Sequence, residues 1–157
     1  MWHCCSCLRK TSADKLGFGL GTTPLIDIRN KYFNSTIMNP KIDNTEFGSI
    51  TIGGEVIEHD VIIHLSGNIE KRKKKLSKAV FGTSHIISLE EAKYIYEKGA
   101  EQLIIGAGQS GMVSLSNEAS EYFKRKQVQI ELSPTPEAIK RWNMAKGSVI
   151  GLFHVTC

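Results

Sequence analysis

Three short apolar segments in the second half of the sequence constrain the fold most, because helical segments separate them. Apolar and β-branched residues fill positions 102–105, 128–132 and 149–155. Runs of this length predict buried strands, and strands that alternate with helices are typical of βαβ crossovers in a parallel sheet. The sequence therefore predicts an α/β fold, or α+β by a stricter count, with a βαβαβ layer.

The segments around these strands carry the signals of helix ends. Ser88-Leu-Glu-Glu91 is a capping box, in which a Ser side chain and a Glu three residues later satisfy the first backbone N–H groups. Lys98-Gly99 ends this helix, Ser116 and Thr135-Pro136 mark two further helix starts, and Lys146-Gly147 ends the last helix. They predict three helices, over residues 89–98, 116–126 and 135–146.

A β-hairpin precedes this layer. Residues 47–52 and 55–65 alternate apolar and polar side chains on either side of Gly53-Gly54, and a two-residue turn of this kind needs positive φ at both positions. With 157 residues, 41% of them hydrophobic, the chain can bury one core. We therefore expect a compact single domain, in which an antiparallel β-hairpin layer joins the parallel-sheet layer.

Residues 1–40 lack this patterning. Glycines and prolines interrupt them, and no helical or strand period persists, which predicts a disordered or poorly ordered N-terminal tail before one domain over residues 41–157. Three early thiols, Cys4, Cys5 and Cys7, are too crowded for a disulfide framework, and whether they bind metal stays open. It also stays open whether residues 1–37 belong to the natural product or act as a targeting segment.

The charge is unevenly distributed. Of the net charge of +4, residues 1–37 contribute five basic and two acidic side chains, so the remainder is nearly neutral. A near-neutral domain argues against nucleic acid as a partner, and no apolar run reaches the ~18 residues of a membrane span. The basic run Lys71–Lys75 is interpreted as a solvated loop or strand edge, with a phosphate contact as the alternative.

A glycine motif follows the first predicted parallel strand. Residues 106–111, Gly-Ala-Gly-Gln-Ser-Gly, have the G-x-G-x-x-G spacing of dinucleotide-binding units. In those units the third glycine lies at the start of a helix, but here the best cap, Ser116, lies five residues beyond Gly111. The motif is better interpreted as a sharp turn at a strand end.

The predicted topology gathers polar residues at one edge of the sheet. At this edge the three predicted strands end and the three predicted helices begin. The helix N-termini supply free N–H groups and a partial positive charge, which favour the binding of an anion. We expect a polar, anion-friendly pocket at this carboxyl edge. The residues expected to bind a ligand there are Ser84, Gly106, Gly108, Gln109, Ser110, Ser116 and Thr135.

Reactive candidates at this edge are few. His85 and His154 could act as acid or base, although His154 shares its strand face with Ile150 and Leu152 and is as well explained as a core residue. Cys157 is a candidate nucleophile if its thiol pKa is lowered. No nucleophile–base–orienter set can be recognised in the sequence.

Four motifs resemble the Mth-domain family, which has an adipogenesis-associated branch and a respiratory complex I assembly branch. They are FGSITIGGEVIEHDVII, LIIGAGQSG, PTPEAIKRWN and the ending GLFHVTC, and they are spread over residues 47–157. The ending is most similar to the adipogenesis-associated branch. The resemblance implies a compact domain with a β-hairpin layer and an α/β layer, and it carries no established enzymatic activity.

The resemblance also selects residues. Those that match family motifs are Asp60, His85, Gly106, Gly108, Thr135, Asn143, His154 and Cys157, and through this match Asn143 joins the expected ligand-binding residues. The run Lys71–Lys75 departs from the family pattern, where Arg and Trp are common, so a shared protein-binding surface is not implied there. Residues 1–40 lie outside the resemblance, so no mitochondrial role is implied.

These observations favour a soluble, cytoplasmic domain that acts as a non-catalytic binding or assembly module. The alternative is a small-molecule enzyme that uses His85 or His154 as acid or base in the anion-friendly pocket. We expect no cofactor and no metal, and as partner either a protein of unknown identity or a small anionic ligand.

Overall fold

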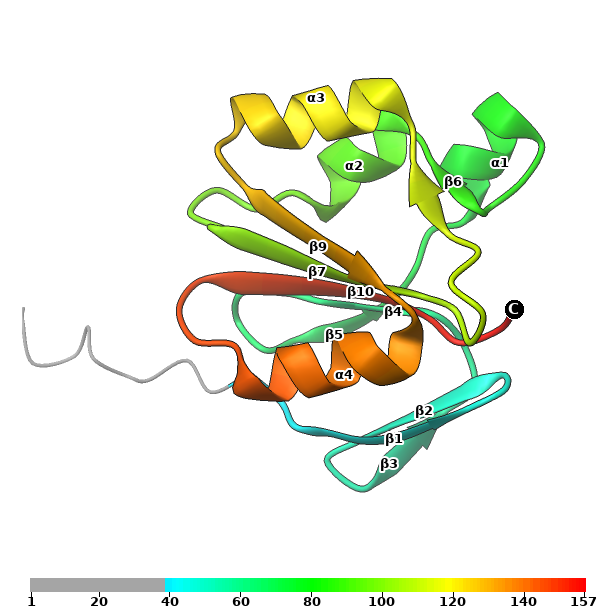
Figure 1. Cartoon of the computed structure of the whole chain (residues 1–157), viewed down its shortest axis with the longest axis vertical. Helices are drawn as coiled ribbons and strands as arrows, with labels where there is room; N and C mark the ends of the chain where they lie inside the picture. The colour runs from blue at the N-terminus through cyan, green and yellow to red at the C-terminus, as the bar shows by residue number, and fades with distance from the viewer. Residues whose placement is uncertain (1–38) are drawn as a thin grey trace, which may run out of the picture. The chain divides into compact units, whose positions relative to one another are not determined.

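The three late strands lie side by side in the computed structural model, which describes residues 39–157 (Figure 1). They belong to a five-stranded sheet whose spatial order is β5 (Ile69–Lys71), β4 (Val61–Ile63), β10 (Val149–His154), β7 (Gln102–Ala107) and β9 (Gln129–Ser133). β7 pairs in parallel with β10 and β9, as predicted. β4 adds to β10 in antiparallel fashion, and β5 pairs with β4 at the edge.

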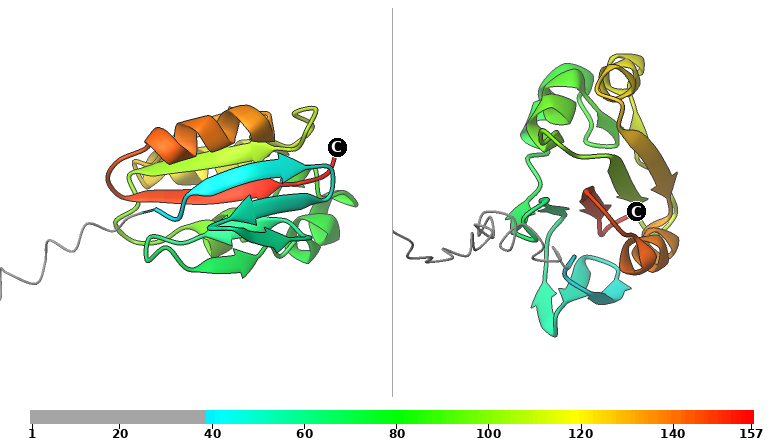
Figure 2. Two further views of the ribbon diagram at one scale, coloured as in Figure 1. Left: turned by 90° about the horizontal axis from the view of Figure 1, so that it is seen from below. Right: turned by 90° about the vertical axis from the view of Figure 1, so that its left-hand side faces the viewer.

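Both faces of this sheet are covered. Helices α2 (Leu89–Ile95) and α3 (Asn117–Arg125) lie on one face, and α4 (Thr135–Met144) lies on the other beside a small second sheet (Figures 1 and 2). A strand covered on both faces is expected to be apolar throughout. All six residues of β10 are buried accordingly.

Alternation along β10 divides the core in two. Ile150 and Leu152 pack toward α2 and α3, whereas Val149 and Phe153 pack toward α4. His154 has the parity of Ile150 and Leu152, so it points to the α2 and α3 side. The strand thereby places an ionisable ring at the end of an otherwise apolar row.

The predicted hairpin is present, but its second strand was predicted too long. β2 (Ser49–Ile52) and β3 (Glu55–Ile57) pair around Gly53-Gly54, and β1 (Ile42–Glu46), which was not predicted, adds to β2. The chain then leaves this sheet and enters the five-stranded sheet as β4. The break between β3 and β4 contains Asp60.

A fourth helix, which the sequence did not predict, begins within the basic run. α1 (Lys75–Phe81) ends at Gly82, which has φ +69° and donates its N–H to Lys78 O. No residue of its first turn is acidic, and its N-cap, Lys74, makes no side-chain cap bond, so local signals did not indicate it. The helix is held instead by its one buried residue, Ser77, whose hydroxyl contacts Ser88 and Glu91.

The predicted helices are otherwise correct, with shorter ends. Ser88 and Ser116 cap α2 and α3 through bonds from Glu91 N and Ala119 N, as expected. The prediction that α2 reaches Lys98 is wrong, because Tyr96 already has extended backbone at ψ 130°.

The glycine motif forms a turn between two strands. β7 ends at Ala107, and β8 (Ser114–Leu115) follows and pairs with β6 (Ile86–Ile87) before α3 begins. The third glycine of the motif therefore does not open a helix, and this geometry differs from that of a dinucleotide-binding unit.

The remaining expectations concern membrane spans, the N-terminal residues and the location of the protein in the cell. Within residues 39–157, none of the helices has the length and apolar character needed to cross a membrane. The tail and the thiols Cys4, Cys5 and Cys7 lie outside the described residues. Cytoplasmic location stays a prediction.

Candidate functional site

Asp60 lies at the break between the two sheets, next to the carboxyl end of β10. Its side chain is 1% exposed. Oδ2 accepts bonds from His154 Nδ1 at 2.6 Å, Lys74 Nζ at 3.0 Å and Arg72 Nη1 at 3.3 Å, and Oδ1 accepts one from Val155 N at 3.2 Å. A buried carboxylate needs partners of this kind, because desolvation of an unpaired charge is costly.

These partners decide the charge of Asp60. Burial alone raises its pKa, but the hydrogen bond and charge of His154, the bond from Lys74 and the bond from Val155 N outweigh burial and bring the pKa down from 3.8 to about 2. Asp60 is therefore ionised near neutral pH. An ionised carboxylate only accepts, so the ring of His154 must carry a proton on Nδ1.

Arg72 forms the second half of this buried network. The sequence interpretation of Arg72 as part of a solvated run is wrong, since the residue is 3% exposed. Its guanidinium binds Glu91 through Nε at 2.7 Å and Nη2 at 3.1 Å, and Nη2 also donates to Ser84 O at 2.8 Å. One side chain thus ties the end of β5 to α2 and to the loop before His85.

His154 links Asp60 to a partly exposed hydroxyl. Its Nδ1 binds Asp60, and its Nε2 lies 3.0 Å from Thr156 Oγ1. The structure thus contains a hydroxyl–imidazole–carboxylate chain, although no such set could be recognised in the sequence. His154 and Asp60 lie 94 residues apart, so spacing could not have shown their contact.

His85 and Cys157 meet beside the ring of His154. The His85 ring packs edge-on against the His154 ring, with centroids 5.6 Å apart. Its Nε2 lies 3.5 Å from Cys157 Sγ, which is exposed. The three candidate reactive residues are thus brought together, as the predicted topology required. We call them the His–Cys cluster.

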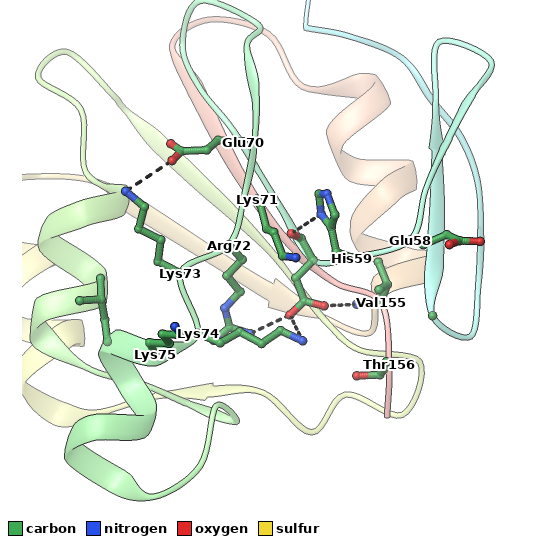
Figure 3. Close-up of a pocket in the computed structure, with 13 residues that line it drawn as sticks. Glu58, His59, Glu70, Lys71, Arg72, Lys73, Lys74, Lys75, Val155 and Thr156 are labelled. Atoms are coloured by element: carbon green, nitrogen blue, oxygen red, sulfur yellow. Dashed lines mark hydrogen bonds and ion pairs between the residues drawn. The ribbon is translucent and has the colours of Figure 1, made fainter.

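A hollow of about 650 Å³ lies beside Asp60 and Thr156 (Figure 3). Its wall includes the whole run from Lys71 to Lys75, the turn at His59 and the two residues after β10, Val155 and Thr156. Within this wall, Arg72 Nη1 and Lys74 Nζ both bind Asp60 Oδ2. We call this feature the basic hollow.

The basic hollow reaches the carboxyl end of β10, but none of the expected ligand-binding residues lines it. Several of those residues make internal contacts instead. Thr135 Oγ1 accepts from Gly108 N at 3.0 Å and donates to His154 O at 2.6 Å. Gln109 Nε2 donates to Thr45 Oγ1 and to Glu46 O, which joins the glycine turn to β1.

The remaining expected residues divide between the edge and the far end of the domain. Ser84 gives its carbonyl to Arg72, Ser116 caps α3, and Ser110 is exposed. Asn143 lies at the other end of α4 from Thr135, where its amide bonds both Ile42 N and Ile42 O. Ligand binding by these residues stays a prediction.

The glycines of the motif are explained by close packing. A Cβ on Gly108, at φ +93°, would lie 1.9 Å from Cys157 O. A Cβ on Gly106 would lie 2.9 Å from Thr135 Oγ1 and 2.8 Å from a Phe153 ring carbon. The turn therefore needs glycine so that the strand ends can approach one another.

Sequence reasoning missed Arg72 and Thr156 as members of this site. For Arg72 a signal existed, because a single Arg in a run of Lys is the side chain suited to a buried, forked carboxylate contact. For Thr156 no local signal existed, because its role depends on the ring of His154, which is held by Asp60.

Comparison with known families gives a match over most of the domain. A family model described as a protein of unknown function (DUF498/DUF598) matches residues 42–153.

Several solved structures are similar to this chain. The conserved hypothetical protein PH1505 from Pyrococcus horikoshii OT3 is 36% identical over 74% of this chain and 99% of its own, with a TM-score of 0.68. A protein named MT938 is 32% identical over 75% of this chain and 99% of its own, with a TM-score of 0.63. A Bordetella pertussis protein described as a Mth938-like domain shares the fold at 13% identity over 75% of this chain and 87% of its own, with a TM-score of 0.54.

Proposed function

This chain belongs to the DUF498/DUF598, or Mth938-like, family, and on that premise we propose that it is a non-catalytic binding module that holds a small organic anion in the basic hollow. The observation that carries the proposal is a hollow of about 650 Å³ walled by five consecutive cationic residues. Small-molecule sites fall in the range of about 300–1,000 Å³. The volume suits an organic anion better than a bare inorganic ion.

The charges around the hollow support an anion. Lys71 to Lys75 face three carboxylates, those of Glu58, Asp60 and Glu70. Asp60 is already neutralised by its buried partners, and Glu70 binds Lys73, His64 and Tyr94. Glu58 lies apart from the cationic run Lys71–Lys75 in Figure 3.

Two cations are left for a ligand. Among residues 39–157, neither Lys71 nor Lys75 forms an ion pair. Lys71 lies on the edge strand β5 and Lys75 opens α1, so the two side chains come from different elements. A ligand carboxylate or phosphate between them would gain charge-assisted hydrogen bonds.

The burial of His154 supports binding rather than catalysis. His154 is 1% exposed, and both ring nitrogens have partners within the protein. The network holds the wall of the hollow in place, because Asp60 and Arg72 connect it to α2 and β10. A rigid wall favours recognition of a bound anion.

A thermal-shift panel tests the proposal. The probes are the organic anions citrate and a nucleoside monophosphate, with pyrophosphate as an inorganic comparison, at constant ionic strength set with sodium chloride. We expect at least one probe to raise the unfolding temperature by several degrees, because a ligand at 100 times its Kd adds about 2.7 kcal/mol of stability.

A charge-matched pair of variants locates the site. Lys71→Gln/Lys75→Gln should abolish the shift, whereas Lys140→Gln/Lys146→Gln, which removes equal charge from two exposed positions outside the hollow, should preserve it. Equal loss in both double variants would mean a non-specific charge effect and would overturn the proposal, as would no shift with any probe.

The second candidate is an enzyme, and the specific observation in its favour is the chain from Asp60 through His154 to Thr156. A carboxylate that fixes the ring and a ring that faces a hydroxyl form the arrangement of an activated nucleophile. The partly exposed Thr156 also lines the hollow. Covalent labelling of Thr156 by an activated phosphonate, detected by mass spectrometry and lost in His154→Gln, would favour this candidate; an unlabelled Thr156 would count against it.

A further inference from the structure

We propose that the His–Cys cluster, formed by His85, His154 and Cys157, is a binding site for a divalent transition-metal ion such as Zn²⁺. One ligand atom from each residue lies within 4.8 Å of the others. Imidazole nitrogen and thiolate sulfur are the donors that Zn²⁺ takes in proteins. No metal was expected here from sequence spacing, because His85 lies far along the chain from the other two residues.

The spacing of the donors fits a tetrahedral ion. With Zn–N near 2.0–2.1 Å and Zn–S near 2.3 Å, a nitrogen and a sulfur ligand lie about 3.5 Å apart. His85 Nε2 and Cys157 Sγ are 3.5 Å apart. The other two pairs lie within 4.8 Å, so closure around an ion needs shifts of about 1 Å or somewhat more. Rotation of the exposed Cys157 side chain can shorten its own distances, and movement of the half-buried His85 ring can shorten its distance from His154.

Asp60 prepares His154 as a ligand. Metal-binding histidines commonly donate the proton of their second ring nitrogen to a carboxylate, which fixes the tautomer and raises the basicity of the ligating nitrogen. His154 Nδ1 lies 2.6 Å from Asp60 Oδ2. Binding of the ion requires His154 Nε2 without a proton, so that its lone pair can coordinate the metal. Nε2 now lies 3.0 Å from Thr156 Oγ1 and would bind the ion in place of that contact.

The backbone also fixes the other two ligands. Arg72 binds Ser84 O, and Ser114 N binds His85 O, so the loop that carries His85 is tied on both sides. Gln109 N binds Thr156 O and holds the residue before Cys157. A site held by surrounding contacts loses less freedom on binding the ion.

Three protein ligands leave one coordination position open. Closed structural zinc sites use four protein ligands, whereas three ligands leave a place for water or for a donor atom of another molecule. Thr156 lies between the cluster and the basic hollow, since its hydroxyl faces His154 and the residue lines the hollow. A ligand in the hollow would thus lie near the open position.

Metal titration of the full chain tests the site. Cys4, Cys5 and Cys7 are replaced by serine, so that Cys157 is the only thiol, and the protein is stripped of metal with a chelator. Zn²⁺ is then titrated in competition with a chromophoric chelator, and Co²⁺ serves as a spectroscopic probe. We expect one ion per chain, proton release on binding and a thiolate-to-cobalt absorption band.

Single variants assign the ligands. Cys157→Ser and His85→Ala should each weaken Zn²⁺ binding by more than about 10-fold, and Cys157→Ser should remove the cobalt band. Circular dichroism checks that both variants fold, which the exposure of Cys157 and the half-burial of His85 favour. The control, His59→Ala, removes a histidine outside the cluster and should change affinity less than about twofold.

Two results would overturn the proposal: no stoichiometric binding of Zn²⁺, or binding that survives both Cys157→Ser and His85→Ala unchanged. Neither result bears on the lysine-dependent thermal shift, so this proposal and the proposed function can fail separately.

Discussion

At the scale of single residues, Asp60 is the point where the buried polar network converges. Its two oxygens receive Arg72, Lys74, His154 and a backbone N–H. The family motif included Asp60, but the sequence could not show its partners, because they come from the end of β5, the start of α1 and β10. The sequence could therefore single out Asp60, but its hydrogen-bond partners could not be predicted, because they depend on the pairing of β4 with β10.

The depressed pKa of Asp60 predicts how stability depends on pH. Because the folded pKa is about 2 and the ordinary value is 3.8, the ionised carboxylate adds about 2 kcal/mol to the free energy of unfolding above roughly pH 4. This contribution is lost as pH falls from about 4 through about 2. Urea unfolding at several pH values measures it.

Asp60→Asn is the comparison for this measurement. The variant should lose most of the stability difference between about pH 5 and about pH 2.5 that is due to this carboxyl group, whatever its stability at neutral pH. If the unfolding free energies of wild type and variant change in parallel over that interval, the ionised Asp60 does not stabilise the fold by about 2 kcal/mol.

Gly108 is the second residue whose environment makes a firm prediction. Gly108→Ala requires a non-glycine residue at φ +93° and places its Cβ 1.9 Å from Cys157 O. We expect a loss of about 1–3 kcal/mol in unfolding free energy, together with weaker Zn²⁺ binding, because the segment that carries Cys157 must move. Gly53→Ala is a suitable control, since it is at φ +58° in the hairpin turn with no atom within 4 Å, and it should leave Zn²⁺ affinity unchanged.

At the scale of elements, the parallel strands could be predicted from the sequence better than the segments that connect the elements. The segments 102–105, 128–132 and 149–155 are long enough and apolar enough to be recognised alone. α1 was not recognised because its stability comes from contacts of Ser77 with Ser88 and α2. Residues 55–65 were predicted as a single strand, because the alternation of apolar and polar side chains continues through the point where the chain passes from one sheet to the other.

The Arg72–Glu91 pair joins the end of β5 to α2 and predicts a strong effect. Arg72→Met leaves Glu91 buried without its cationic partner and removes one of the three side-chain partners of Asp60, and we expect a loss of about 3–5 kcal/mol. Arg72→Met combined with Glu91→Met should recover part of that loss, because the second change removes the unpaired charge. Denaturant titration measures both, and a double variant less stable than the single one would contradict this reasoning.

At the scale of the whole described domain, β10 brings the residues of the site together. It lies between β4 and β7, and it ends where β7 and β9 end, beside the glycine turn (Figure 1). This gathering could be predicted from the βαβ rule, and so could the meeting of His85, His154 and Cys157. The basic hollow could not, because it forms between β5, α1 and the corner after β3, all of which depend on tertiary packing.

The central claim is that the basic hollow holds an organic anion. Amide chemical shifts measured by nuclear magnetic resonance test it most directly, during a titration with the organic probe that gives the largest thermal shift. The claim predicts that the largest saturable shifts fall on residues 71–75 and on Val155 and Thr156, with small shifts on the exposed face of α3. Saturable shifts centred instead on the glycine turn at 108–111, or shifts that grow linearly without saturation at any site, would contradict it.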